Sequence, residues 1–211
     1  MVLKQKRDST DTLIVDASKG FVKSGKNNML RAGDIRRIVD VVAARADVEK
    51  YSRLVSRDEI RENDYNLNIP RYVDSSEDPE TWDIYASMFG GIPANEIDAL
   101  SPYWEAFPGL RGELFDVQPN GYAQCKDDPA AIVNGHASVL EFEENYRRAF
   151  DGFGDFLHEH LVSRCETVKV SREENLLTQD IFTRLDGIPL VDRYAAFQMP
   201  VSYTHLTLPT I

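Results

Sequence analysis

Residues 63–74, NDYNLNIPRYVD, carry three asparagines, two tyrosines, two aspartates and an arginine within twelve positions. Side-chain amides and a guanidinium can hydrogen-bond to base edges and phosphates. This composition makes the stretch a candidate nucleic-acid surface. Its candidate DNA-facing residues are Asn66, Asn68, Arg71 and Tyr72.

Leu67 and Ile69 follow one another at an interval of two, the period of a strand with one buried face. This spacing predicts a half-buried strand whose asparagines point to the other side. Pro70 cannot donate to a sheet ladder, so the strand either ends there or lies at an edge. The alternative is a structural edge strand whose Asn and Asp residues make turns and contact no ligand.

Charge separates the chain into two parts, although the net charge is −11. Residues 1–72 hold 15 lysines and arginines against 11 acidic residues, whereas residues 73–200 hold 9 against 24. The first part is the one suited to phosphate contact. Residues 20–28, with Lys23 and Lys26, are predicted to be a mobile basic loop that is either solvated or in contact with phosphates. The acidic part suits a protein partner or a solvated surface.

Short elements are expected to position residues 63–74. Val2–Leu3 and residues 12–16 read as two strands of a hairpin, and residues 51–55 as another strand. Asp34 is predicted to cap an amphipathic helix, and Ser56 with Glu59 forms a capping box. The helix's apolar stripe consists of Ile35, Ile38, Val39, Val42 and Ala46. Alternating strands and helices predict an α/β region at the edge of a larger sheet.

Residues 75–80 are acidic and small, which indicates a linker and a domain boundary. Beyond it, proline and glycine signals predict helices over residues 93–100, 102–109 and 138–165, the last broken near Gly152. Ser171 with Glu174 predicts the start of another helix. The aromatic stripe of the long helix consists of Phe142, Tyr146, Phe150, Phe153 and Phe156 and is predicted to be core. No basic residues interleave it, as a base-stacking platform requires.

Several site classes have no support in the residue pattern. His158 and His160 lack the spacing of a zinc helix, and no Cys–His cluster has metal-ligand spacing. Cys125 and Cys165 follow no disulfide framework and are expected to be reduced. No apolar run is long enough to span a membrane, and no signal peptide is recognisable, so a cytoplasmic protein is expected.

Several strings in this chain resemble, in the same order, the methylation subunit of type I restriction-modification systems, which are adenine-N6 DNA methyltransferases. They are VLKQKRDSTDTLIVDASKGFVKSGKNNML, YNLNIPRYVD, DIYASMFGGIP and IPLVDRYAAFQ. The resemblance covers roughly residues 1–199. It implies an α/β edge of a methyltransferase (Rossmann-like) sheet over residues 1–74, followed by a mostly α-helical region over residues 75–200.

The resemblance implies transfer of a methyl group from S-adenosylmethionine to adenine N6 in DNA, together with a specificity subunit and a restriction subunit. The family's glycine-containing cofactor loop and its Asn-Pro-Pro-aromatic motif do not occur in this sequence. No catalytic, cofactor-binding or metal residue is therefore carried over, and this chain alone is expected to be inactive. The competing hypothesis is a non-enzymatic protein-interaction module in which residues 63–74 are purely structural.

Residues 201–211, VSYTHLTLPTI, carry no charged side chain and depart from the family pattern. They resemble the translation of a transposon-type sequencing adapter. We therefore expect them to be an artefact that follows a helix ending near Met199.

Overall fold

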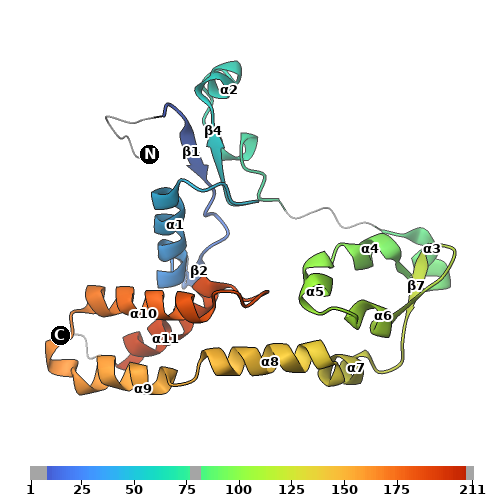
Figure 1. The fold of residues 1–211 in the computed structure, drawn as a ribbon. Helices are drawn as coiled ribbons and strands as arrows, with labels where there is room; N and C mark the ends of the chain where they lie inside the picture. Colours follow the sequence, from blue (N-terminus) through green and yellow to red (C-terminus); the bar gives the residue numbers. More distant parts are fainter. Residues whose placement is uncertain (1–8, 77–81, 208–211) are drawn as a thin grey trace. The chain divides into compact units, whose positions relative to one another are not determined.

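The computed structural model describes residues 9–76 and 82–207, except for the side chains of residues 202–207 (Figure 1). Its contacts divide the chain into two units. The first unit runs to Pro79 and also includes the residues from Gln198 onward, and the second is Glu80–Phe197. Each unit is described below by itself.

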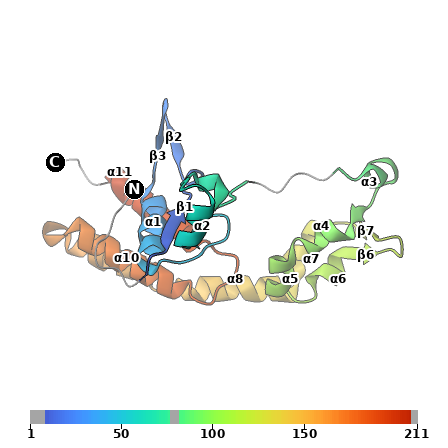
Figure 2. The same cartoon turned by 90° about the horizontal axis from the view of Figure 1, so that it is seen from above.

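Two antiparallel strand pairs form the sheets of the first unit. Strands β1, Thr12–Val15, and β4, Ser52–Val55, lie where the sequence predicted strands, and they pair with each other, which it did not predict. Residues 20–28, predicted to be a mobile loop, instead contribute to a hairpin of β2, Val22–Ser24, and β3, Asn27–Met29, which Figure 2 shows extending from the unit. Gly25 in its turn has φ +62°, a conformation that glycine adopts without strain. The predicted strand Val2–Leu3 lies outside the described residues.

Two α-helices lie within residues 9–76 of the first unit. Helix α1, Ala32–Ala44, begins two residues before Asp34, so the prediction that Asp34 is the N-cap is wrong. Asp34 is instead the third helical residue, and its carboxylate accepts a hydrogen bond from the backbone N–H of the N-cap, Arg31, at 2.9 Å. Helix α2, Arg57–Glu62, has the predicted cap, because the Ser56 hydroxyl accepts from the Glu59 N–H at 3.1 Å.

The apolar stripe of α1 is less buried than its spacing suggests. Ile35, Val39 and Val42 are each about half exposed, whereas Val41 is 6% exposed. A two-stranded sheet offers a helix little surface to cover. Part of the stripe therefore remains in contact with solvent.

The core of the first unit joins its sheet to α2 and to the segment that follows. It consists of Ile14, Val55, Ile60, Tyr72 and Val73. Val55 is completely buried and Val73 is 4% exposed. The small antiparallel sheets agree with an α/β composition, but they do not by themselves identify the edge of a Rossmann-like sheet.

The second unit begins with short helices around a sheet that the sequence did not predict. Strands β5 (Ile92–Pro93), β7 (Tyr122–Cys125) and β6 (Phe115–Val117) pair antiparallel in that order. The helices here are α3 (Ile84–Phe89), α4 (Ala94–Asp98), α5 (Ser101–Ala106), α6 (Leu110–Leu114) and α7 (Pro129–Gly135). Leu110, Leu114 and Val139 form a core cluster in this unit.

The rest of the described chain is mostly helical. Its elements are α8 (Ala137–Ala149), α9 (Phe153–Leu157), the π-helix η2 (His158–Ser163), the 3-10 turn η3 (Cys165–Thr167), α10 (Val170–Arg184) and α11 (Arg193–Thr207). The predicted break at Gly152 is confirmed, with φ +70° at that residue. Ser171 is not an N-cap, because Lys169 precedes the first residue of α10.

Aromatic rings follow one another along α8 and α9 at helical spacing. The ring centroids of Tyr146 and Phe150 are 5.1 Å apart, and those of Phe150 and Phe153 are 5.4 Å apart. None of the stripe's side chains is fully buried, and Tyr146 is 37% exposed. The prediction that this stripe is core is therefore wrong, because it is a half-buried line of rings in stacked, tilted and T-shaped pairs.

The predicted tail of residues 201–211 continues a helix that does not end near Met199. Helix α11 passes through Pro200 to Thr207, and Val201 is 6% exposed. The Gln198 side-chain oxygen accepts a hydrogen bond from the Gly33 N–H at 2.9 Å within the first unit. Residues 208–211 lie outside the described residues, and the adapter origin of the tail stays a prediction.

Candidate nucleic-acid interface

Residues 63–74 form a tight loop and the 3-10 turn η1, Ile69–Arg71, so the predicted strand is wrong. Asp64 and Tyr65 both adopt left-handed backbone conformations, with φ +54° and +57°. Asn and Asp side chains favour such local turns over a sheet ladder. Leu67 and Ile69, the expected buried face, are instead 49% and 37% exposed.

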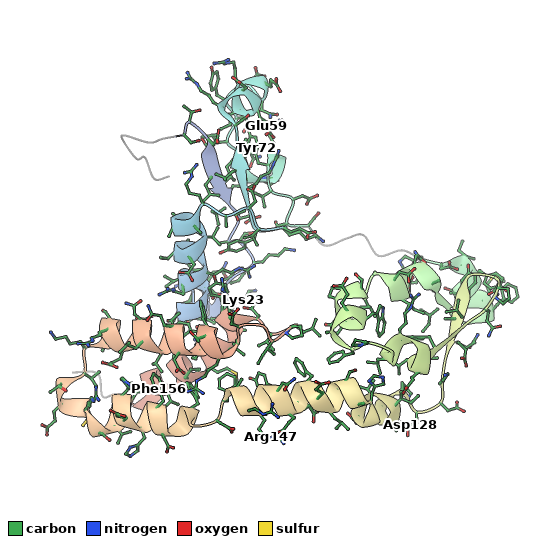
Figure 3. All side chains as sticks on the ribbon, viewed as in Figure 1. Lys23, Glu59, Tyr72, Asp128, Arg147 and Phe156 are labelled. Carbon is green, nitrogen blue, oxygen red and sulfur yellow. The ribbon has the colours of Figure 1, made fainter. Side chains whose placement is uncertain are left out.

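Tyr72 holds this loop against the core rather than facing outward. Its side chain is 5% exposed and lies in the same cluster as Val55 and Ile60. Its hydroxyl donates a hydrogen bond of 2.6 Å to the backbone oxygen of Asn66. Figure 3 labels Tyr72 close to β4 and to Glu59 of α2. The prediction that Tyr72 points to the polar side is wrong, and its position fits a supporting role.

The other three candidate residues lie together on the exposed side of the loop. The Asn66 side-chain oxygen accepts a hydrogen bond from the Asn68 N–H at 3.0 Å, which fixes a short turn. The Arg71 guanidinium lies 3.5 Å from the side-chain oxygen of Asn63, a long hydrogen bond. Asn66, Asn68 and Arg71 are all exposed, so their amide and guanidinium groups are accessible to a ligand.

Tyr65 is a candidate that the sequence argument did not select. It is 62% exposed, and its backbone lies in the left-handed region. An exposed phenol ring on a rigid turn can stack on an unpaired base. The signal in the sequence was the Asn-Asp pair before it, which favours a turn that carries the next side chain outward.

The charge of the first unit is divided between neutralised pairs and accessible cations. Arg53 binds the Glu59 carboxylate with two hydrogen bonds of 2.9 and 3.0 Å, so it is not available to a ligand. Lys23 and Lys26 lie exposed on the β2–β3 hairpin.

The pKa of Asp16 is held below its usual value by hydrogen bonds to its carboxylate. The hydrogen bond from the Ser75 hydroxyl has the largest effect, and the one from the Ser18 side chain has the next largest.

One pocket of the first unit is smaller than the pockets that usually hold a cofactor such as S-adenosylmethionine. A pocket of about 220 Å³ lies at the start of β4, lined by charged residues that include Asp47, Lys50 and Asp74. Cofactor pockets measure roughly 300–1,000 Å³ and are mostly apolar. No glycine lines this pocket. Over residues 9–76 and 82–207, no group of three His, Cys, Asp or Glu side chains lies close enough together to hold a metal ion.

No helix in the part of the chain that the structure describes is both long and apolar enough to cross a membrane.

Comparison with known proteins shows that the first unit is similar in sequence to DNA methylases. Residues 1–81 match the family model of N-6 DNA methylase. The methylase subunit of the type I restriction enzyme MpnII from Mycoplasma pneumoniae is 38% identical over 85 residues, 40% of this chain and 16% of that protein. The MjaVII methylase subunit from Methanocaldococcus jannaschii is 41% identical over 93 residues, 42% of this chain and 16% of that protein.

A solved structure shows the same likeness in sequence. The type I restriction-modification methyltransferase subunit from Streptococcus thermophilus is 44% identical, with a TM-score of 0.34, over 35% of this chain and 16% of that one. The resemblance to type I methylation subunits is therefore confirmed. This chain spans 16% of the length of these relatives, and the resemblance predicted for residues 82–199 stays a prediction.

Proposed function

We propose that this chain is part of a type I restriction-modification methylation subunit, in which the first unit contributes a DNA-contacting edge. The parent protein would transfer a methyl group from S-adenosylmethionine to adenine N6 in DNA. The match of residues 1–81 to the N-6 DNA methylase family carries this proposal. Because the family's glycine-containing loop and Asn-Pro-Pro-aromatic motif do not occur in this sequence, we assign the cofactor and flipped-base pockets to the remainder of the parent and expect this chain alone to be inactive.

Within the first unit, the loop of residues 63–71 is the proposed contact with DNA. Arg71 supplies a guanidinium for phosphate, and Asn66 and Asn68 supply amides for phosphate or base edges. Tyr72 acts through the loop by fixing its backbone at Asn66, as the 2.6 Å hydrogen bond supports. Tyr65 adds an exposed ring for stacking.

For the second unit we propose contact with protein partners, the specificity and restriction subunits of a cytoplasmic type I complex. Apolar side chains are unusually exposed in α3 and just before it. Trp82, which precedes the helix, is 83% exposed, and Ile84 and Met88 in the helix are 75% and 70% exposed. Exposed apolar groups gathered in one place indicate a protein contact. The same observation supports the second candidate function, a non-enzymatic interaction module. The two candidates differ in whether a methyltransferase core accompanies this chain.

DNA binding by the 211-residue chain tests the contact surface. Replacing Arg71→Glu removes a cation and adds repulsion, and we expect duplex affinity to fall about tenfold in fluorescence anisotropy at low salt. The matched control is Arg148→Glu, an exposed arginine of α8 in the acidic part of the chain. An unchanged affinity for the Arg71 variant would remove the loop from the DNA interface.

Resequencing the source DNA across both ends of the reading frame tests the parent protein. We expect an upstream frame encoding a glycine-containing cofactor loop and an Asn-Pro-Pro-aromatic motif. A frame that truly starts at Met1 and stops after Ile211 would instead leave the interaction module as the better account.

A further inference from the structure

A second charged site lies in the second unit, between the π-helix η2 and the beginning of α10. It is a pocket of about 260 Å³. Four basic side chains line it, from η2, the segment after it and the first turn of α10: His160, Arg164, Lys169 and Arg172. One carboxylate, that of Glu173, also lines it.

The acidic groups at this pocket are already engaged. The Glu173 carboxylate lies 2.9 Å from Nδ1 of His160, and Arg164 forms an ion pair with Glu159. Among the residues that the structure describes, the side chains of Lys169 and Arg172 make no hydrogen bond or ion pair. Two cations of the pocket therefore have no counter-charge.

These two cations are exposed at a helix end where an anion is favoured over a cation. Lys169 and Arg172 sit at the N-cap and in the first turn of α10, a helix of 15 residues. A helix N-terminus carries partial positive charge, so cations there are destabilising and anions are stabilising. No side chain caps this helix end. A bound anion would neutralise the side chains of Lys169 and Arg172. The same anion would accept hydrogen bonds from uncapped backbone N–H groups at the start of α10.

The surroundings make the cluster more distinctive. Residues 73–200 carry 24 acidic residues against 9 lysines and arginines, yet three of those cations line this one pocket. The adjoining segment His158–Ser163 is π-helical, a rare geometry that is frequent at functional sites. Guanidinium groups match phosphate oxygens in pairs.

We propose that this pocket binds a phosphate group, held chiefly by Lys169 and Arg172 with Arg164 beside them. Its volume is below the usual range for cofactor pockets, which suits a single small anion. The site shares no residue with the proposed DNA-contacting loop, so it can be right or wrong independently of the proposed function.

Isothermal titration calorimetry of the full 211-residue chain with inorganic phosphate, at constant ionic strength, tests the site. We expect saturable binding whose affinity falls at least about tenfold in the double variant Lys169→Gln, Arg172→Gln. The matched control, Arg147→Gln with Arg148→Gln, removes two exposed arginines of α8 and should change the affinity less than about twofold. Figure 3 labels Arg147 on that helix.

Two results would overturn the proposal: no saturable binding to the unaltered chain up to about 50 mM phosphate, or the same affinity in the double variant as in the control. Circular dichroism checks that the variants fold. If the double variant unfolds, Arg172→Lys keeps the charge but loses the paired geometry. An intermediate loss of affinity in that variant supports the site, and an unchanged affinity contradicts the assigned role of Arg172.

Free phosphate and a nucleic-acid backbone present the same chemistry, and a competition experiment separates them. If a short DNA duplex displaces phosphate, and the double variant loses duplex affinity while the Arg71→Glu variant retains phosphate binding, the site takes a phosphodiester. If phosphate binds and the duplex does not displace it, the site takes a free phosphate or phosphate monoester. Both results support a phosphate site.

Discussion

Tyr72 in the first unit and Tyr146 in the second are the same residue type but differ in how they are buried and what they contact. Tyr72 is 5% exposed, belongs to a cluster of five buried side chains and hydrogen-bonds to the backbone. Tyr146 is 37% exposed in a line of rings along one helix. The first unit concentrates its stability in a small closed core, whereas α8 and α9 spread theirs along a half-open surface.

Truncating one core residue in the first unit should give the largest effect. Ile60→Ala removes a side chain that is 8% exposed, and we expect a loss of about 3 kcal/mol in the free energy of unfolding because a cavity remains. Hydrogen exchange of β1 and β4 peptides would measure it. Both tryptophans, Trp82 and Trp104, lie in the second unit, so their fluorescence follows that unit separately.

The control for this comparison is the same kind of truncation on α8. Leu140 is 49% exposed, so Leu140→Ala should change the unfolding free energy by about 0.5 kcal/mol or less. Equal losses from the two substitutions would break the contrast between a closed core and a half-open surface.

Removing one hydroxyl tests how the candidate loop is held. Tyr72→Phe keeps the buried ring but deletes the donor to the Asn66 oxygen, and we expect a loss of about 1 kcal/mol with faster hydrogen exchange in residues 64–71. Tyr146→Phe is the matched control, because no hydrogen bond of its hydroxyl is present among the described residues. A loop that exchanges equally slowly in both variants would show that Tyr72 does not fix it.

The smallest expected effect concerns the first turn of α1. Hydrogen bonding to the Arg31 side chain is the largest cause that holds the pKa of Asp34 below its usual value. Because the folded pKa is the lower one, the charge stabilises the fold above the unfolded pKa of about 3.9, and that contribution is lost as the pH falls through the folded pKa. Asp34→Asn should cost about 0.5–1 kcal/mol at pH 6.

Urea unfolding at a series of pH values measures this difference. The gap between the unaltered chain and the Asp34→Asn variant should close as the pH falls below about 4. The control is Asp155→Asn in α9, whose side chain is exposed. A gap that stays constant with pH would mean that the charge of Asp34 contributes nothing to the stability of the first unit.

Local chemistry alone determined several features of this protein. Ser56 caps α2 because its hydroxyl accepts a hydrogen bond from the backbone N–H three residues later. This interaction is local and does not depend on what packs around the helix. Gly152 interrupts the long helical pattern because glycine readily adopts its left-handed conformation. The family resemblance could also be recognised from the sequence, because it rests on matching strings of residues and not on how deeply those residues are buried.

Tertiary structure decided what spacing could not. The alternation of Leu67 and Ile69 predicted a strand, but no neighbouring strand pairs with them among the described residues, and turn chemistry prevailed. Tyr72 and the aromatic stripe of α8 and α9 have similar chemistry, yet only Tyr72 has partners on every side. Burial and strand pairing depend on residues distant in sequence, as the pairing of β1 with β4 shows, and spacing along the chain does not reveal them.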